Sequence, residues 1–131
     1  MLTKKKALEK TVHMWRWIAE ECEKRKRAIS KKEYFEYHNI SDIPLSRCYL
    51  CEYQYQFKVH TCLIKKWNLE DDDCLGGGCC CGDYEFGDYR DGFYDNDYKK
   101  CIKAANTIAD LAEMELKKLE KEADIKNTLL K

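Results

Sequence analysis

The stretch "IKAANTIADLAEMELKKLEKEA", residues 102–123, decides the fold class of this chain. Its apolar and small residues recur every three or four positions, and it contains neither glycine nor proline. This spacing places a single apolar stripe on one side of an α-helix. We expect a long helix over residues 96–128, with a cap from Asp95 or Asp97. Its stripe contains Ile102, Ala105, Ile108, Ala109, Ala112, Leu116, Leu119 and Ala123.

The N-terminal segment has the same kind of pattern and predicts a second long helix over residues 1–28. Its stripe contains Leu8, Val12, Trp15, Ile18 and Cys22. Two long helices with one apolar face each bury those faces most simply against each other. We therefore expect an antiparallel pair of long helices, with the stripe residues Cys22 and Cys101 packed in the core.

The segment between the two long helices is expected to contain a short helix and a strand-like module. Ser30 stands three residues before Glu33, a capping-box pattern that predicts a short helix over residues 30–39. From Cys48 onward, aromatic and polar residues alternate in "YQYQFKVH", residues 53–60, which is typical of a strand. The chain of 131 residues is expected to form a single, mainly α domain, with a small zinc-stapled β-ribbon or loop module between the helices.

The nine cysteines of the chain indicate metal binding rather than disulfides in a reducing compartment. The pair in "CYLC", residues 48–51, can chelate one tetrahedral zinc ion. We therefore predict structural zinc in a cysteine-rich module over residues 48–82. A redox role would instead place the CxxC pair at the start of a helix that follows a strand. The expected zinc ligands are Cys48, Cys51, Cys62 and Cys81, with His60, Cys74, Cys79 and Cys80 as alternatives for the fourth.

Charge is distributed unevenly, although the net charge is zero. Residues 1–33 contain 11 Lys and Arg against 5 Asp and Glu, whereas residues 70–98 contain one base against 10 acids. An acidic-aromatic loop is expected over residues 83–95. Such carboxylates can stand in for phosphates in a basic groove, and tyrosine supplies rigid contact area. The predicted partner-binding residues are Tyr84, Asp88, Tyr89, Asp91, Tyr94 and Asp95.

The basic run Lys24, Arg25, Lys26 and Arg27 offers a second type of surface, a contact for nucleic acid. No catalytic residue is predicted, because His13, His38 and His60 stand apart in the sequence and no phosphate loop is present. No apolar run approaches the roughly 18–20 residues of a membrane span, and no secretory signal follows the basic N-terminus. We therefore expect a cytoplasmic protein without membrane contact.

Several stretches together resemble a group of small, largely uncharacterised bacteriophage proteins. They are "MWRWIAEE" at 14–21, "KRKRAISKKEYFEYHNI" at 24–40, "IPLSRCYLCEY" at 43–53 and "GFYDNDYKKCIKAANTIADL" at 92–111. In that group a tryptophan-bearing first helix, a CxxC knuckle with further cysteines, and a closing helix recur in this order. The group's second CxxC is replaced here by "HTCLIKKW", residues 60–67, so the resemblance implies His60 or a cysteine of the triplet 79–81 as the substitute ligand.

These observations predict a non-enzymatic phage accessory protein that acts in the host cytoplasm. It is expected to bind and modulate a host protein, such as a defence or nucleic-acid enzyme, through the zinc module and the acidic-aromatic loop. The alternative is a small zinc-containing regulator that binds nucleic acid through the basic run. The sequence leaves the oligomeric state open.

Overall fold

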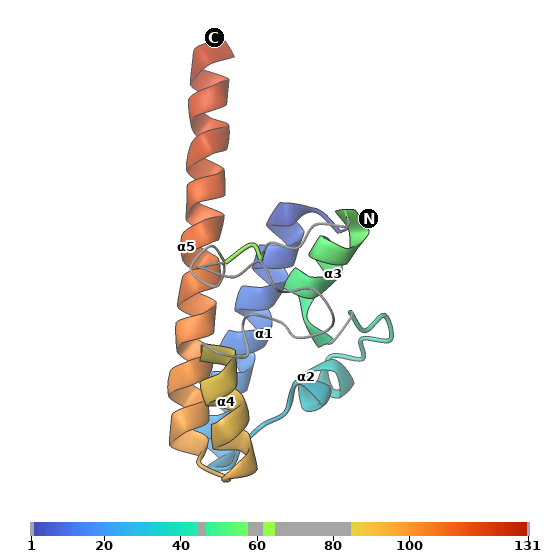
Figure 1. Ribbon diagram of the computed structural model, residues 1–131, viewed down its shortest axis with the longest axis vertical. Coiled ribbons are helices and arrows are strands. Elements are labelled where there is room, and N and C mark those ends of the chain that lie inside the picture. Colours follow the sequence, from blue (N-terminus) through green and yellow to red (C-terminus); the bar gives the residue numbers. More distant parts are fainter. Residues whose placement is uncertain (1, 45–46, 58–61, 65–84, 131) are drawn as a thin grey trace.

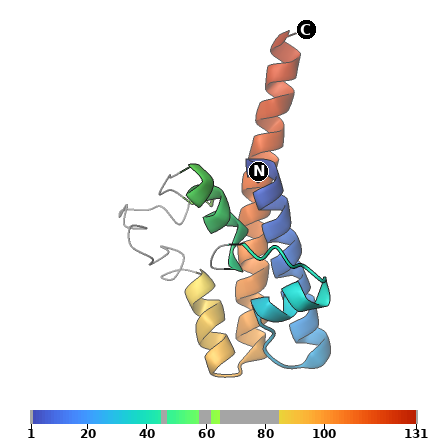
Figure 2. The same cartoon turned by 90° about the vertical axis from the view of Figure 1, so that its right-hand side faces the viewer.

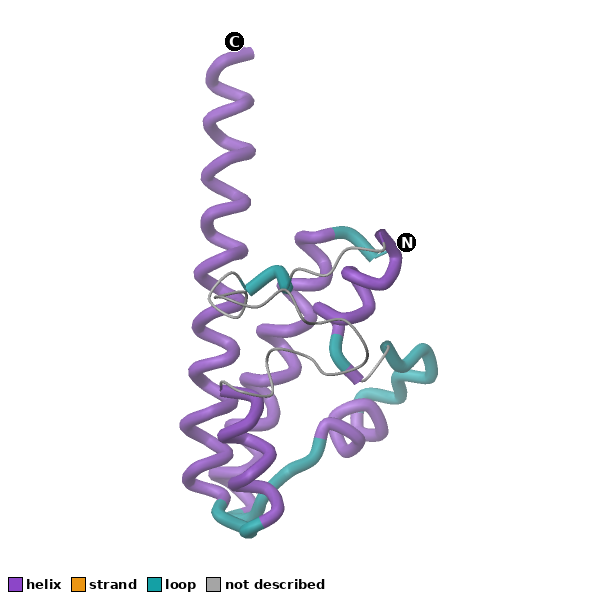
Figure 3. The backbone as a smooth tube through the Cα atoms, viewed as in Figure 1, coloured by secondary structure: helices purple, strands orange, loops and turns teal. Residues whose placement is uncertain are grey.

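The computed structural model describes residues 2–44, 47–57, 62–64 and 85–130. These residues form five helices and no strand (Figures 1 and 3). The protein is therefore mainly helical, as the sequence predicts. The helices are α1 (Lys4–Arg25), α2 (Lys31–Tyr37), α3 (Tyr49–Phe57), α4 (Glu85–Tyr94) and α5 (Tyr98–Leu130).

Helix α1 has well-defined ends and one buried face. Thr3 caps its N-terminus by accepting a hydrogen bond from the Lys6 backbone N–H at 3.1 Å. Lys26 ends it in the left-handed conformation, with φ of 54°, and donates its N–H to the Cys22 carbonyl oxygen. The predicted N-terminal helix is confirmed. Its buried face contains Ala7, Leu8, Thr11, Met14, Trp15, Ile18, Ala19 and Cys22.

Helices α1 and α5 lie side by side and run in opposite directions (Figures 1 and 2). The buried residues of α5 extend from Cys101 through Glu115, at the three- and four-residue spacing read from the sequence. Beyond this region α5 continues past the start of α1, and its stripe residue Ala123 is exposed. The predicted pairing therefore covers only the first part of the C-terminal helix.

Arg16 joins the two long helices through polar contacts. Its guanidinium donates from Nη1 to Asn106 Oδ1 at 3.1 Å and from Nη2 to the carboxylates of Asp110 and Glu113. The hydrogen bond to Asp110 is the largest cause that raises the Arg16 pKa, so the guanidinium stays positively charged. The contacts span two turns of α5.

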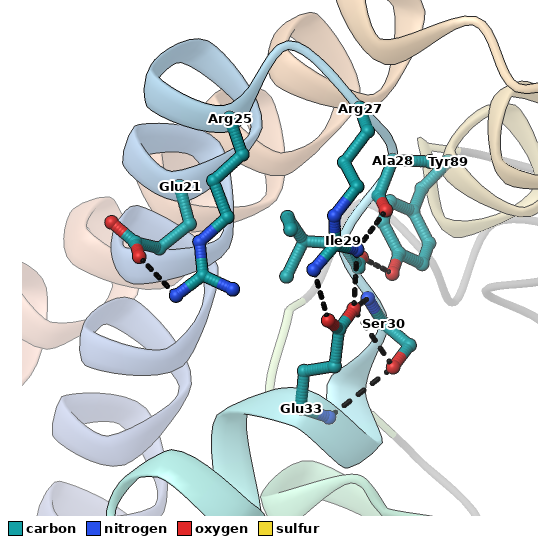
Figure 4. Close-up of polar contacts among 8 residues, drawn as sticks. All are labelled: Glu21, Arg25, Arg27, Ala28, Ile29, Ser30, Glu33 and Tyr89. Atoms are coloured by element: carbon teal, nitrogen blue, oxygen red, sulfur yellow. Dashed lines mark hydrogen bonds and ion pairs between the residues drawn. The ribbon is translucent and has the colours of Figure 1, made fainter.

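Helix α2 begins with the predicted capping box, which Figure 4 shows in detail. The Ser30 hydroxyl oxygen accepts from the Glu33 N–H at 3.2 Å, and the Glu33 carboxylate accepts from the Ser30 N–H at 2.9 Å. Each side chain thus satisfies a backbone donor that the helix start leaves open. The short helix is confirmed.

Helix α3 corrects the prediction of a β-ribbon over its residues. The Cys48 carbonyl oxygen accepts from the Glu52 N–H at 3.0 Å, which is the first helical hydrogen bond. Tyr49, Leu50 and Gln54 are buried, while Tyr55 is 72% exposed. Burial at these positions follows a helical period and packs α3 against α1. The alternation of aromatic and polar residues hid this helical period in the sequence. Residues 58–61 and 65–82 of the predicted module lie outside the described residues.

Helix α4 occupies residues 85–94 of the acidic-aromatic loop predicted over residues 83–95, and residues 83–84 lie outside the described part of the chain. Glu85, Tyr89 and Gly92 are buried at spacings of four and three residues, so they form one helical face, and α4 packs on α5. A Cβ added at Gly92 would stand 3.1–3.2 Å from Lys100 Cβ, the Asp97 oxygen and the Cys101 nitrogen. Glycine, which the sequence presents as a loop signal, here permits the close approach of two helices.

Candidate functional site

The basic run at the C-terminal end of α1 is largely neutralised by neighbouring acids (Figure 4). Glu21 pairs with Lys24 at 3.7 Å and with Arg25 at 3.0 Å, and Glu33 pairs with Arg27 at 2.6 Å. The hydrogen bond from Arg27 is the main cause that lowers the pKa of Glu33, which keeps this carboxylate charged. These pairs reduce the positive field that a phosphate backbone would meet.

The predicted partner-binding residues divide between two faces of α4. Asp88, Asp91, Tyr94 and Asp95 are exposed, and Tyr94 is 79% exposed. The three carboxylates are spaced three and four residues apart, which places them along one side of the helix. The Asp95 N–H donates to the Asp91 oxygen at 3.0 Å, so the turn continues through Asp95. The sixth predicted residue, Tyr84, lies outside the described residues.

Tyr89 corrects the predicted contact set because it belongs to the core. It is 5% exposed, and its hydroxyl donates to the Ile29 carbonyl oxygen in the loop before α2 (Figure 4). Burial raises its pKa, so the phenol stays neutral. Its ring meets Trp15 edge-on, with 4.8 Å between centroids. Tyr89 therefore fixes α4 to the core and leaves the carboxylates on a rigidly held helix.

The predicted zinc ligands are described only in part. Cys48 precedes α3, Cys51 lies in its first turn, and both are half-buried; Cys62 is 5% exposed. Cys48 and Cys62 lie in or against the same hydrophobic core. Within the described residues, no three side chains of His, Cys, Asp or Glu form a metal-binding group. The predicted Cys81, and the alternatives His60, Cys74, Cys79 and Cys80, lie outside the described residues.

The position of the CxxC pair bears on its chemistry. The start of α3 has a partial positive charge from its backbone N–H groups, which favours a thiolate. A zinc knuckle and a redox pair both use such a thiolate. Residues 40–44 and 47–48, which precede α3, contain no strand. The strand that a thioredoxin-like redox site requires is therefore not found in the described part of the chain.

Cys22 and Cys101 pack in the core, as the sequence predicts. Both have no exposed surface. Burial raises the pKa of both thiols, that of Cys101 to about 11, so neither ionises near neutral pH. Cys101 also donates a weak hydrogen bond to the Tyr89 carbonyl oxygen at 3.7 Å. These thiols serve packing.

The structure brings His13 and His38 together, although they stand 25 residues apart in the sequence. Their ring centroids are 5.3 Å apart, and both rings contact Tyr34. Trp17 also packs against His38, at 5.3 Å between centroids. The sequence contains one relevant signal, a spacing of four residues. This spacing separates His13 from Trp17 on α1 and Tyr34 from His38 at α2, so the members of each pair lie on the same side of a helix.

Comparison of this chain with models of known families, with curated proteins and with solved structures finds no match. The resemblance to bacteriophage proteins therefore stays a prediction. Among the described residues, no helix has both the length and the apolar composition that crossing a bilayer requires.

Proposed function

We propose that this chain is a non-enzymatic phage accessory protein that binds and modulates a host protein through the exposed face of α4. One observation carries this proposal: Asp88, Asp91 and Asp95 present three carboxylates along one side of a helix that is fixed to the core. A rigid row of negative charge complements a basic groove, such as that of a nucleic-acid enzyme. Exposed Tyr94 adds an aromatic contact beside the row.

The basic run supports the alternative, nucleic-acid binding, less well. Glu21 and Glu33 already pair with Lys24, Arg25 and Arg27, so binding phosphates would require these ion pairs to be exchanged. Within the described residues, Lys26 alone of the four cations has no ion pair. The acidic face of α4 requires no such exchange, because its three carboxylates have no ion pair with the described residues.

Neutralising the acidic face tests the protein-binding proposal. The variant Asp88→Asn/Asp91→Asn/Asp95→Asn should bind its partner about 3- to 150-fold more weakly, since three screened charge pairs of 0.2–1 kcal/mol each contribute about 0.6–3 kcal/mol together. Partners are first captured from bacterial host lysate and identified by mass spectrometry. The dissociation constant is then measured with the purified partner.

The matched control is Glu20→Gln/Glu23→Gln/Glu120→Gln. These glutamates are exposed on α1 and α5, and the change raises the net charge by the same three units. Its affinity should equal that of the unmodified protein. If both triple variants lose affinity equally, net charge rather than the α4 face governs binding. If neither loses affinity, the α4 face has no part in it.

We also propose that structural zinc is held by Cys48, Cys51, Cys62 and Cys81. The support is the CxxC pair at the start of α3, where helix N–H groups stabilise thiolates, and the burial of Cys62 in the core that Cys48 contacts. Metal binding at such a site contributes directly to the free energy of folding. The ion would thus hold the segment between α2 and α4 to the α1–α5 pair.

Elemental analysis tests this zinc site. Freshly purified, reduced protein should contain about one zinc ion per chain after dialysis, and Cys51→Ser should contain much less. Cys22→Ala serves as the control, because it removes a buried thiol from α1 with a residue of similar size and should retain the metal. Zinc-free unmodified protein, or equal zinc content in all three proteins, would contradict the assignment.

A further inference from the structure

His13 and His38 form a pair of imidazoles at the junction of α1 and α2. Their ring centroids are 5.3 Å apart, with planes inclined at 74°. His13 is exposed and His38 is half-buried, so solvent and small ions reach the pair. Neither residue belongs to the proposed zinc ligands of the cysteine module.

Tyr34 forms a hydrogen bond with the Nδ1 atom of each histidine ring. His38 Nδ1 lies 2.9 Å from the Tyr34 carbonyl oxygen, and His13 Nδ1 lies 2.7 Å from the Tyr34 hydroxyl oxygen. A carbonyl oxygen only accepts, so His38 Nδ1 carries the proton and the lone pair of the neutral ring is on Nε2. These are the hydrogen bonds of the two rings within the described residues, and they leave both Nε2 atoms unengaged.

This arrangement matches the way proteins orient histidine ligands. A metal-binding imidazole usually donates its second N–H to a backbone carbonyl or another oxygen, which fixes its tautomer and ring orientation. A metal ion bonded to Nε2 stands about 2.0–2.1 Å from that atom, and hence about 3.2 Å from the ring centroid. Two imidazoles on one tetrahedral ion then have centroids about 5.2 Å apart. The His13 and His38 centroids are 5.3 Å apart, which is close to this value.

We propose that His13 and His38 form a two-histidine site for a divalent transition-metal ion of the class that prefers imidazole, such as Zn²⁺, Ni²⁺ or Cu²⁺. The Nε2 atoms are the ligands, and Tyr34 positions both rings. Metal binding selects the His13 tautomer whose Nδ1–H donates to the Tyr34 hydroxyl oxygen. Water or an external ligand fills the other coordination positions. The ion joins α1 to α2 independently of the cysteine module.

Retention of the untagged full-length chain on immobilised Ni²⁺ tests for joint binding. The imidazole concentration needed for elution is measured for the unmodified protein, His13→Gln, His38→Gln and the double variant. Because chelation needs both rings, either single variant should elute as early as the double variant. Lys32→Gln, which changes an exposed side chain of α2, is the control and should elute with the unmodified protein. Stepwise losses that add up, or an equal loss in Lys32→Gln, would overturn the proposal.

A second measurement leaves both histidines in place. In the ¹⁵N-histidine-labelled unmodified protein as purified, added Zn²⁺ should shift the Nε2 resonances of His13 and His38 together. Tyr34→Phe retains both histidines but removes the hydroxyl partner of His13, and should raise the apparent Kd for Zn²⁺ about 10–100-fold. Unshifted Nε2 resonances, or shifts at different Zn²⁺ concentrations, would show that no shared site exists.

Discussion

We expect Trp15→Ala to lower the free energy of unfolding by about 3–5 kcal/mol, the range for truncation of a large aromatic residue in a core. Trp15 is 4% exposed on α1, and its ring meets Tyr89 and Phe86 of α4 edge-on at 4.8 and 6.2 Å. Truncation would leave a cavity where α1 meets α4, and Tyr89 would lose its packing partner. Urea unfolding followed by far-UV circular dichroism measures the effect.

Trp17→Ala is the matched control for this prediction. Trp17 stands two residues further along α1, is half-buried, and packs on Tyr34, Tyr37 and His38 near the surface. Its truncation should cost about 1–2 kcal/mol, because less apolar area is returned to water. Equal costs for the two variants, or a greater cost for Trp17→Ala, would contradict the placement of Trp15 in the core.

The second large effect is expected from Ala105→Asp. Ala105 has no exposed surface on the buried stripe of α5, where α1 and α4 pack. An unpaired carboxylate at this position costs about 3–5 kcal/mol, comparable to the whole stability of a marginal domain. The variant should lose its cooperative thermal transition or show a strongly lowered midpoint by calorimetry.

The same substitution further along α5 provides the control. Ala123 lies on the stripe read from the sequence, but it is exposed where α5 continues past α1. Ala123→Asp should therefore change the free energy of unfolding by no more than about 0.5 kcal/mol. A large loss of stability on substitution of Ala123 would mean that another surface covers this part of α5 in solution, because the described residues leave it exposed.

The sequence predicted the elements whose signals are local. The apolar spacing along α1 and α5 reports which side of each helix is buried, and the capping box at Ser30 and Glu33 reports where α2 begins. Such signals require no knowledge of distant residues. The extent of burial along α5 does require such knowledge, since Ala123 has the correct spacing but is exposed, with none of the described elements packed on it.

The sequence prediction was wrong for the two elements in which local sequence signals conflict with tertiary packing. In α3 the alternation around Tyr53 and Tyr55 is typical of a strand, yet packing against α1 favours a helix. In α4 the glycines and acids favour a loop, but Gly92 is the close contact with α5 and Tyr89 is a core anchor. Propensity is a weak guide where tertiary contacts decide the local structure. The His13–His38 pair depends on how α2 folds back on α1, which no local pattern encodes.

Arg16 has a consequence for the alignment of the two long helices. The face of α5 that meets α1 is rich in small residues, among them Ala105, Ala109 and Ala112, and such a smooth surface is compatible with sliding by one turn, about 5.4 Å. Several alignments would then have similar apolar burial. Only one of them places the guanidinium against Asn106, Asp110 and Glu113 together. Arg16 therefore has less effect on the strength of helix association than on the alignment of the two helices along their axes.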